Sequence, residues 1–272
     1  MTQRDPYFLG QSDDEQERLK KQAEVLAQDA SELFDLIGIA PGWRVVELGC
    51  GPRGCLDLLS RRVAAKGSVV GVEIDKEAVE HARSYLAAAG IKNAEVRQGD
   101  ATATGLVPGS FDMAMARLLM INIPKPERVI AEMVTLVKPG GVVAFQEGDW
   151  GLQVSEPPSP ALEHLLGVFE TYARRNGMDM FVGRKLPRWL KAVGLNDVQV
   201  RPIVRAYSVD SPQRTFLVQF VDNLRDRILG EGLISERELN QSVAALKRHL
   251  SDPDVLLLFP LMIQAWGRKP LQ

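Results

Sequence analysis

The stretch VVELGCGPRGCL, residues 45–56, decides the fold, because it joins an apolar run to a glycine-rich turn. The run ends with the acid Glu47, and Gly49, Gly51 and Gly54 follow it. Gly49 and Gly51 can adopt positive φ angles and carry no side chain, so a ligand can approach the backbone where the next helix starts. A G-x-G-x-x-G spacing is a weak signal by itself, and the rest of the chain must decide what this turn holds.

Strands and helices are predicted to alternate after this turn. Apolar runs typical of buried strands, with helical periodicity between them, cover residues 44–48, 68–74, 94–98, 111–116 and 141–148, and two later strands are expected at 197–209 and 256–269. Such alternation produces a parallel sheet with helices on both faces. We therefore predict an α/β, Rossmann-like fold with a seven-stranded, mostly parallel sheet and additional helical cap segments.

The cap segments are expected outside the alternating region. Residues 12–37 have the apolar spacing of an amphipathic helix, continuous or broken in two. A helical stretch of roughly forty residues separates the last two strands, far more than a hairpin needs. We expect an N-terminal helical cap segment at 1–37, a core at 38–210 completed by a final strand at 254–268, and an inserted helical cap at 211–250.

Composition indicates a soluble globular protein without attraction to polyanions. The 272 residues carry a net charge of −2 and the pI is near 6, so nucleic acid is not an expected partner. Cys50 and Cys55 form no disulfide framework or zinc set, and we predict no metal site. The N-terminus lacks a signal segment and the longest apolar run, 255–263, is too short to cross a membrane. We expect a cytoplasmic monomer or homodimer.

Acidic residues mark the ends of three successive predicted strands: Glu47, Glu73 and Asp100. Ligands of open parallel sheets bind at this edge. A nicotinamide dinucleotide would bring a diphosphate close to these carboxylates, whereas S-adenosylmethionine brings a sulfonium, an ammonium, a ribose diol and an adenine amine, which suit them. The acids favour S-adenosylmethionine, although the spacing from Gly51 to Glu73 also fits a dinucleotide fingerprint.

Taken together, these motifs resemble the class I S-adenosylmethionine-dependent methyltransferases, in particular the branch of ubiquinone/menaquinone-biosynthesis-like and natural-product small-molecule methyltransferases. The resemblance covers residues 42–150. VVELGCGPRG is similar to the family's first motif, VVGVEID to its second-strand acid, RQGDA to its adenine-site motif, and FDMAMARLLMINIP with LVKPGG to its fourth-strand and crossover region. It implies transfer of a methyl group from S-adenosylmethionine to an O, N or C atom of a small-molecule acceptor.

The resemblance implies which residues hold the methionine part of the cofactor. Gly49, Cys50 and Gly51 would lie against it, and Glu47 would hold the turn and face the ammonium group. Arg117, after the fourth strand, would lie beside the methionine moiety and the substrate entrance.

The resemblance also implies how the adenosine part is held. Glu73 would bind the ribose diol, and Ile74 would pack on the adenine. Asp100 would accept a hydrogen bond from the adenine amine, with the amide of Ala101 close to the ring.

The candidate catalytic residues follow from a departure from the family pattern, because Asn122 stands where histidine is common. Glu147, Asp149 and the hydroxyl of Tyr7 are the remaining candidates at the acceptor site. A carboxylate buried beside Trp150 would have a raised pKa and could act as a base near neutral pH. An acceptor that is acidic enough needs no base.

Two other hypotheses stay open. A relative of the fold can keep S-adenosylmethionine yet catalyse a reaction without methyl transfer, or only bind the cofactor. A nicotinamide-dependent oxidoreductase is the second alternative. A nucleic-acid methyltransferase is disfavoured by the charge and by the lack of an Asn/Asp-Pro-Pro-aromatic motif after the fourth strand.

Overall fold

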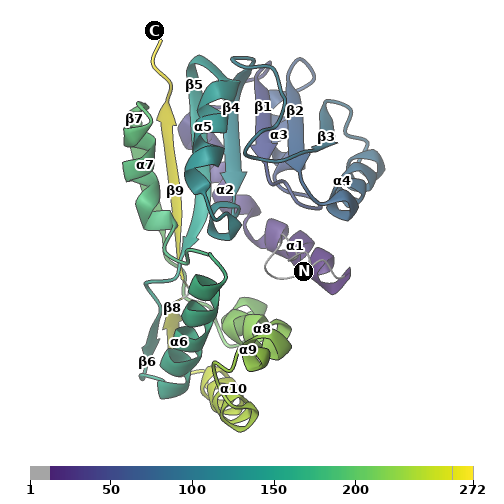
Figure 1. Cartoon of the computed structure of the whole chain (residues 1–272). Helices are drawn as coiled ribbons and strands as arrows, with labels where there is room; N and C mark the ends of the chain where they lie inside the picture. The colour runs from purple at the N-terminus through teal and green to yellow at the C-terminus, as the bar shows by residue number, and fades with distance from the viewer. Residues whose placement is uncertain (1–12, 259, 272) are drawn as a thin grey trace.

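The computed structural model describes residues 13–258 and 260–271, with the backbone alone for 13–17. Its main feature is a seven-stranded sheet of order β3-β2-β1-β4-β5-β9-β7 (Figure 1). The strands are β1 (Arg44–Leu48), β2 (Ser68–Glu73), β3 (Ala94–Gln98), β4 (Phe111–Arg117), β5 (Val137–Asp149), β7 (Asn196–Ile203) and β9 (Leu261–Arg268). β1 to β5 are parallel, and β9 is antiparallel to both of its neighbours. The predicted α/β, mostly parallel sheet is confirmed.

Helices cover both faces of the sheet. One face packs against α2 (Ala27–Ile37), α3 (Leu56–Val63) and α4 (Lys76–Ala88), and the other against α5 (Pro126–Leu136) and α7 (Leu186–Ala192). Side chains alternate between the faces, so Val45 and Met113 face the first group while Val46 and Ala114 face the second. Burial on both faces explains why the central strands are continuous apolar runs.

A second layer of helices lies beyond the carboxyl ends of the strands (Figure 1). It contains α6 (Pro160–Arg175), α8 (Phe216–Asn223), α9 (Arg225–Gly230) and α10 (Glu236–Leu250), which share an apolar core of their own. The helix α6 belongs to this layer although it lies in the range expected to form the sheet core. α1 (Asp13–Val25) lies between this layer and the sheet, and a break at Leu26 separates it from α2. Within the described ranges, every helix is too short or too polar to span a membrane.

Two predicted strands differ from the observed ones. The segment expected at 256–269 is divided at Pro260 into β8 (Leu256–Leu258), which pairs with β6 (Val154–Glu156), and β9. Proline cannot donate a ladder hydrogen bond, which favours a break there. The segment expected at 197–209 leaves the sheet after Ile203. Short 3₁₀ helices complete the chain: η1 (Met120–Asn122), η2 (Gly183–Lys185) and η3 (Pro212–Thr215).

Candidate functional site

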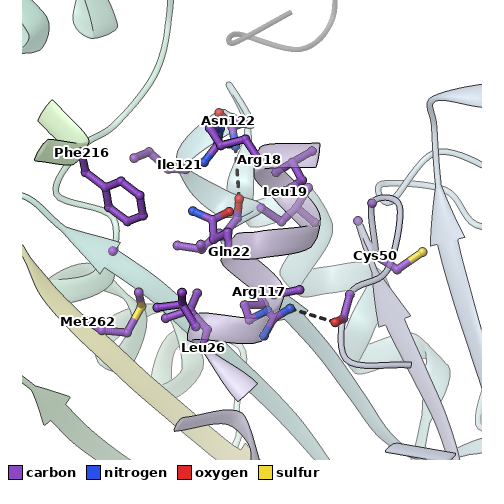
Figure 2. A pocket seen from close by; sticks show the side chains of 18 of the residues that line it. Arg18, Leu19, Gln22, Leu26, Cys50, Arg117, Ile121, Asn122, Phe216 and Met262 are labelled. Atoms are coloured by element: carbon purple, nitrogen blue, oxygen red, sulfur yellow. Dashed lines mark hydrogen bonds between the residues drawn. The ribbon is translucent and has the colours of Figure 1, made fainter. Parts of the chain in front are cut away.

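A cavity of about 260 Å³ opens at the carboxyl ends of β1, β2 and β4. It lies where the strand order reverses between β1 and β4, the position at which open α/β sheets bind ligands. α1 crosses it, with the glycine turn that carries Cys50 on one side and Phe216 and Met262 on the other (Figure 2). The cavity therefore connects two compartments, one at the glycine turn and one against the cap.

The glycine turn is held by buried hydrogen bonds. The amide of Gly49 donates to the carbonyl of Val72 (2.8 Å), and the amide of Cys55 donates to both carboxylate oxygens of Glu47 (3.0 and 2.8 Å). Gly54 has a φ of +55°, and a Cβ placed on it would lie 2.6 Å from Oε2 of Glu47. The turn therefore closes tightly around Gly54.

Glu47 and Arg117 both line the wall of this compartment. Burial raises the pKa of Glu47 to about 7, and the positive charge of Arg117 opposes the rise. Nη2 of Arg117 donates to the carbonyl of Gly54 (2.9 Å; Figure 2). Its buried Nη1 has no hydrogen-bond partner among the described residues, so a donor is free beside the cavity.

Glu73 ties the glycine turn to the end of β2. Its Oε2 accepts from the amide of Gly51 (2.9 Å), and its Oε1 accepts from the amides of Ile74 (2.8 Å) and Asp75 (3.0 Å). Ile74 is 52% exposed and also lines the cavity. An exposed isoleucine beside a carboxylate offers an apolar surface and an acceptor to one ligand.

Three predicted cofactor residues lie differently from the rest. Cys50 contributes backbone to the turn, but its thiol points away from the cavity (Figure 2), and burial raises the pKa of that thiol. Asp100 and Ala101 follow the edge strand β3 and are absent from the cavity wall. Oδ1 of Asp100 accepts from the amide (2.7 Å) and hydroxyl (2.8 Å) of Thr102. The adenine roles of Asp100 and Ala101 stay predictions.

Glu147 does not occupy the position predicted for a base facing the acceptor. It is fully buried behind the cavity wall, and its Oε1 accepts from the amides of Leu119 (2.9 Å) and Met120 (3.0 Å). Burial raises its pKa to about 8, against the opposing effect of these amides. The preceding residue of this turn, Leu118, has a φ of +51° and lines the cavity. Glu147 therefore holds a strained turn in place and does not itself reach the cavity.

Asp149 is likewise engaged away from the cavity. Arg184 donates to it from Nε (2.7 Å) and Nη2 (2.6 Å), and the amide of Gly151 adds a third bond (3.0 Å). Burial alone would raise the pKa of Asp149, but these hydrogen bonds outweigh it and hold the pKa below its ordinary value. A carboxylate paired in this way anchors the end of β5 and is a poor base. The third candidate, Tyr7, lies outside the described residues.

Aromatic side chains form the compartment against the cap. Trp150 lies with its ring centroid 5.1 Å from that of Phe169 and 5.6 Å from that of Phe220. These three rings, with Phe216 and Met262, line the cavity. Such a wall suits a flat apolar acceptor and excludes water.

Sequence reasoning missed three polar residues of this compartment, Asp29, Arg205 and Tyr207, which all line the cavity. Asp29 pairs with Arg205 although 176 positions separate them. Burial raises the pKa of Asp29, and Arg205 opposes that rise. The available signal was the position of Asp29 on the apolar face of its helix, three residues after Leu26 and four before Leu33, where an acid requires a partner.

The geometry agrees with the relatives that the chain matches. Residues 39–180, just over half of the 272, match the family described as methyltransferase domain, and the chain belongs to this family. Nocamycin O-methyltransferase of Saccharothrix syringae is 30% identical over 138 residues, which cover 51% of this chain and 47% of that protein. The chain spans about half the length of the first curated relatives it matches.

Two solved structures share the fold. Phosphoethanolamine N-methyltransferase 2 of Haemonchus contortus, in complex with phosphomonomethylethanolamine and S-adenosylhomocysteine, has a TM-score of 0.57 and 16% identity over 89% of this chain and 52% of that one. The 4+2 cyclase SpnF has a TM-score of 0.51 and 21% identity over 90% of this chain and 83% of that one. The architecture is thus that of the class I S-adenosylmethionine-dependent methyltransferases, and one fold relative is named for a different reaction.

Proposed function

We propose that this protein transfers the methyl group of S-adenosylmethionine to a small-molecule acceptor. The observation that carries the proposal is a cavity that joins a turn lined by carboxylates to a compartment lined by aromatic rings. A cationic nucleoside fits the first compartment and an apolar acceptor fits the second. When bound, the cofactor supplies a methyl group already activated by its sulfonium.

The glycine-turn compartment has the chemistry that this cofactor requires. Glu73 presents a carboxylate for the ribose hydroxyls, and the exposed side of Ile74 offers a surface for the adenine. The free Nη1 donor of Arg117 suits the methionine carboxylate, and Glu47 suits the ammonium group. A Cβ on Gly51 would meet no atom within 4 Å, so this part of the turn opens toward the ligand.

The cavity wall contributes to catalysis by positioning the reactants. The strained turn at Leu118, held by Glu147, forms the wall between the two compartments. Trp150 and the phenylalanines of the cap hold the acceptor and exclude water from the transfer.

Calorimetric titration with S-adenosylhomocysteine tests cofactor binding. We expect affinity in the micromolar range, about −8 kcal/mol, and much weaker binding of NAD. Glu73→Gln replaces the carboxylate with a neutral amide. The loss of charged hydrogen bonds to the ligand should weaken binding by roughly 1.5–3 kcal/mol, or about 10- to 150-fold in affinity. Glu80→Gln, an exposed acid on α4, is the matched control and should have no effect. Equal affinity of wild type and Glu73→Gln would contradict the assignment.

A labelled-methyl assay over phenols, amines and quinones tests the transfer itself. Labelled product together with S-adenosylhomocysteine supports the proposal. Binding of S-adenosylhomocysteine without any labelled product would favour the alternative in which the fold relative binds this cofactor for another reaction.

A further inference from the structure

A row of polar side chains crosses four strands beneath the cavity. Arg117 of β4 is in register with Gln146 of β5, Gln146 with Gln264 of β9, and Gln264 with Arg201 of β7. Residues in register share one face of the sheet, here the face that α2 covers. Farther from the cavity along β5 and β9, the next pair on this face, Ala144 and Trp266, belongs to its apolar packing. The polar row therefore begins where the strands reach the cavity.

The start of α2 is fixed on this row by buried hydrogen bonds. Nε2 of Gln264 donates to the backbone carbonyl of Asp29 (2.7 Å) and to Oε1 of Gln146 (3.3 Å). Nη1 of Arg201 donates to Oε1 of Gln264 (3.2 Å), and its Nη2 pairs with Glu32 on the next turn of α2. Asp29 is thus held at a defined position at the edge of the cavity, beside β9.

Only one of the two carboxylate oxygens of Asp29 has a hydrogen-bond partner among the described residues. The residue is 1% exposed and lines the cavity, and its Oδ1 pairs with Arg205. Its Oδ2 is buried, and the part of the chain that the structure describes offers it no hydrogen-bond partner. A buried carboxylate oxygen without a partner is costly unless a ligand donates a hydrogen bond to it. Oδ2 of Asp29 is therefore an acceptor that a ligand in the cavity can use.

We infer that Asp29 binds the hydroxyl of a phenolic acceptor and takes its proton during methyl transfer. The inference rests on the proposed function. The aromatic wall of Trp150, Phe169 and Phe220 would hold the flat ring, which leaves its hydroxyl toward Asp29. The acceptor oxygen forms the bond to the methyl carbon, and the carbon–sulfur bond breaks. Its electron pair stays on sulfur, which becomes the neutral thioether of S-adenosylhomocysteine, and the hydroxyl proton passes to Oδ2.

The charges around Asp29 suit this role. Arg205 pairs with it, Arg201 lies nearby, Glu32 adds a negative charge on the same helix, and Tyr207 lies close on the cavity wall. Burial and Glu32 raise the pKa of Asp29, whereas the two arginines lower it. The net rise makes this carboxylate a stronger base than an exposed aspartate. Arg205 orients it and keeps it ionised when the acceptor binds.

The test uses 4-nitrophenol, whose phenolate absorbs visible light, bound to the complex of the protein with S-adenosylhomocysteine. Its apparent pKa is read by titration in wild type and in Asp29→Asn. An ionised Asp29 opposes a second negative charge beside it, so we expect the pKa of bound nitrophenol to be lower in Asp29→Asn by about one unit or more. Labelled-methyl transfer to 1-naphthol should fall about 10²- to 10⁴-fold in the same variant. Affinity for S-adenosylhomocysteine should stay within about threefold, because Asp29 is not part of the glycine turn.

Glu80→Gln is the control, because Glu80 is an exposed acid of α4 that is not part of the cavity wall. It should change neither the pKa of bound nitrophenol nor the rate. If Asp29→Asn does not fold, Arg205→Met keeps the carboxylate and removes its partner, and it should move the acid limb of the pH–rate profile to higher pH. Unchanged nitrophenol titration and rate in Asp29→Asn, or an unchanged pH–rate profile in Arg205→Met, would overturn the inference, as would failure of nitrophenol to bind. Failure of wild type to bind S-adenosylhomocysteine would instead refute the proposed function.

Discussion

Replacement of Gly54 by alanine tests whether the glycine turn is built around Glu47. A Cβ on Gly54 would lie 2.6 Å from Oε2 of Glu47 and 2.8 Å from the carbonyl oxygen of Cys50. Contacts this short force one of these oxygens to move. Because both carboxylate oxygens of Glu47 accept from the amide of Cys55, a shift of that side chain breaks buried hydrogen bonds.

The expected loss has two parts. Alanine in the left-handed conformation that Gly54 adopts, with φ at +55°, costs about 1 kcal/mol. Loss of the hydrogen bonding to the buried Glu47 carboxylate costs roughly 1.5–3 kcal/mol more. Gly54→Ala should therefore lower the free energy of unfolding by about 2.5–4 kcal/mol, and it should weaken S-adenosylhomocysteine binding because the turn no longer keeps its shape.

Gly90→Ala separates contact from backbone strain. Gly90, which follows the C-terminal end of α4, has a φ of +66°, but a Cβ there would meet no atom within 4 Å. Only the strain of about 1 kcal/mol applies to it. Urea denaturation, monitored by circular dichroism, gives the free energy of unfolding of both variants. Equal losses in Gly54→Ala and Gly90→Ala would refute the argument that contact with Glu47 requires a glycine at position 54.

Two further predictions concern the carboxylates that end β5. The pKa of Glu147 is raised from 4.5 to about 8, so its contribution to stability is present below 4.5 and lost as pH rises toward 8. In Glu147→Gln, the free energy of unfolding measured by urea denaturation should decline less between about pH 5 and 8 than in wild type. The same pH profile in both proteins would exclude the raised pKa of Glu147 as the cause. Arg184→Ala leaves the buried Asp149 unpaired and should cost roughly 2–3 kcal/mol, since Arg184 is 54% exposed. Arg188→Ala, an exposed arginine of α7, should cost far less, and similar losses would disprove the role of the pair.

Two of the predicted cofactor residues, Glu47 and Glu73, line the same cavity because their strands are neighbours. β1 and β2 are adjacent and parallel, so Glu47 and Glu73 reach the same sheet edge from positions that the sequence reveals. The glycine turn between them is local in sequence. Asp100 follows β3 at the edge of the sheet and is drawn into a turn of its own by Thr102, and nothing in the strand pattern reveals that turn.

The acceptor half depends on long-range pairings that periodicity does not encode. Glu147 and Asp149 follow the rule that strand ends carry function, yet one holds the turn at Leu119 and the other binds Arg184, which lies 35 positions later. Asp29 breaks that rule, because it reaches the cavity from a helix. An acid on an apolar helix face indicates only that some partner must exist. That the partner is Arg205, and that Oδ2 has no hydrogen-bond partner among the described residues, follows from how β7 and β9 position α2 on the sheet. Asp29, which we propose takes the proton, therefore lies outside the set of residues that follow the predicted strands.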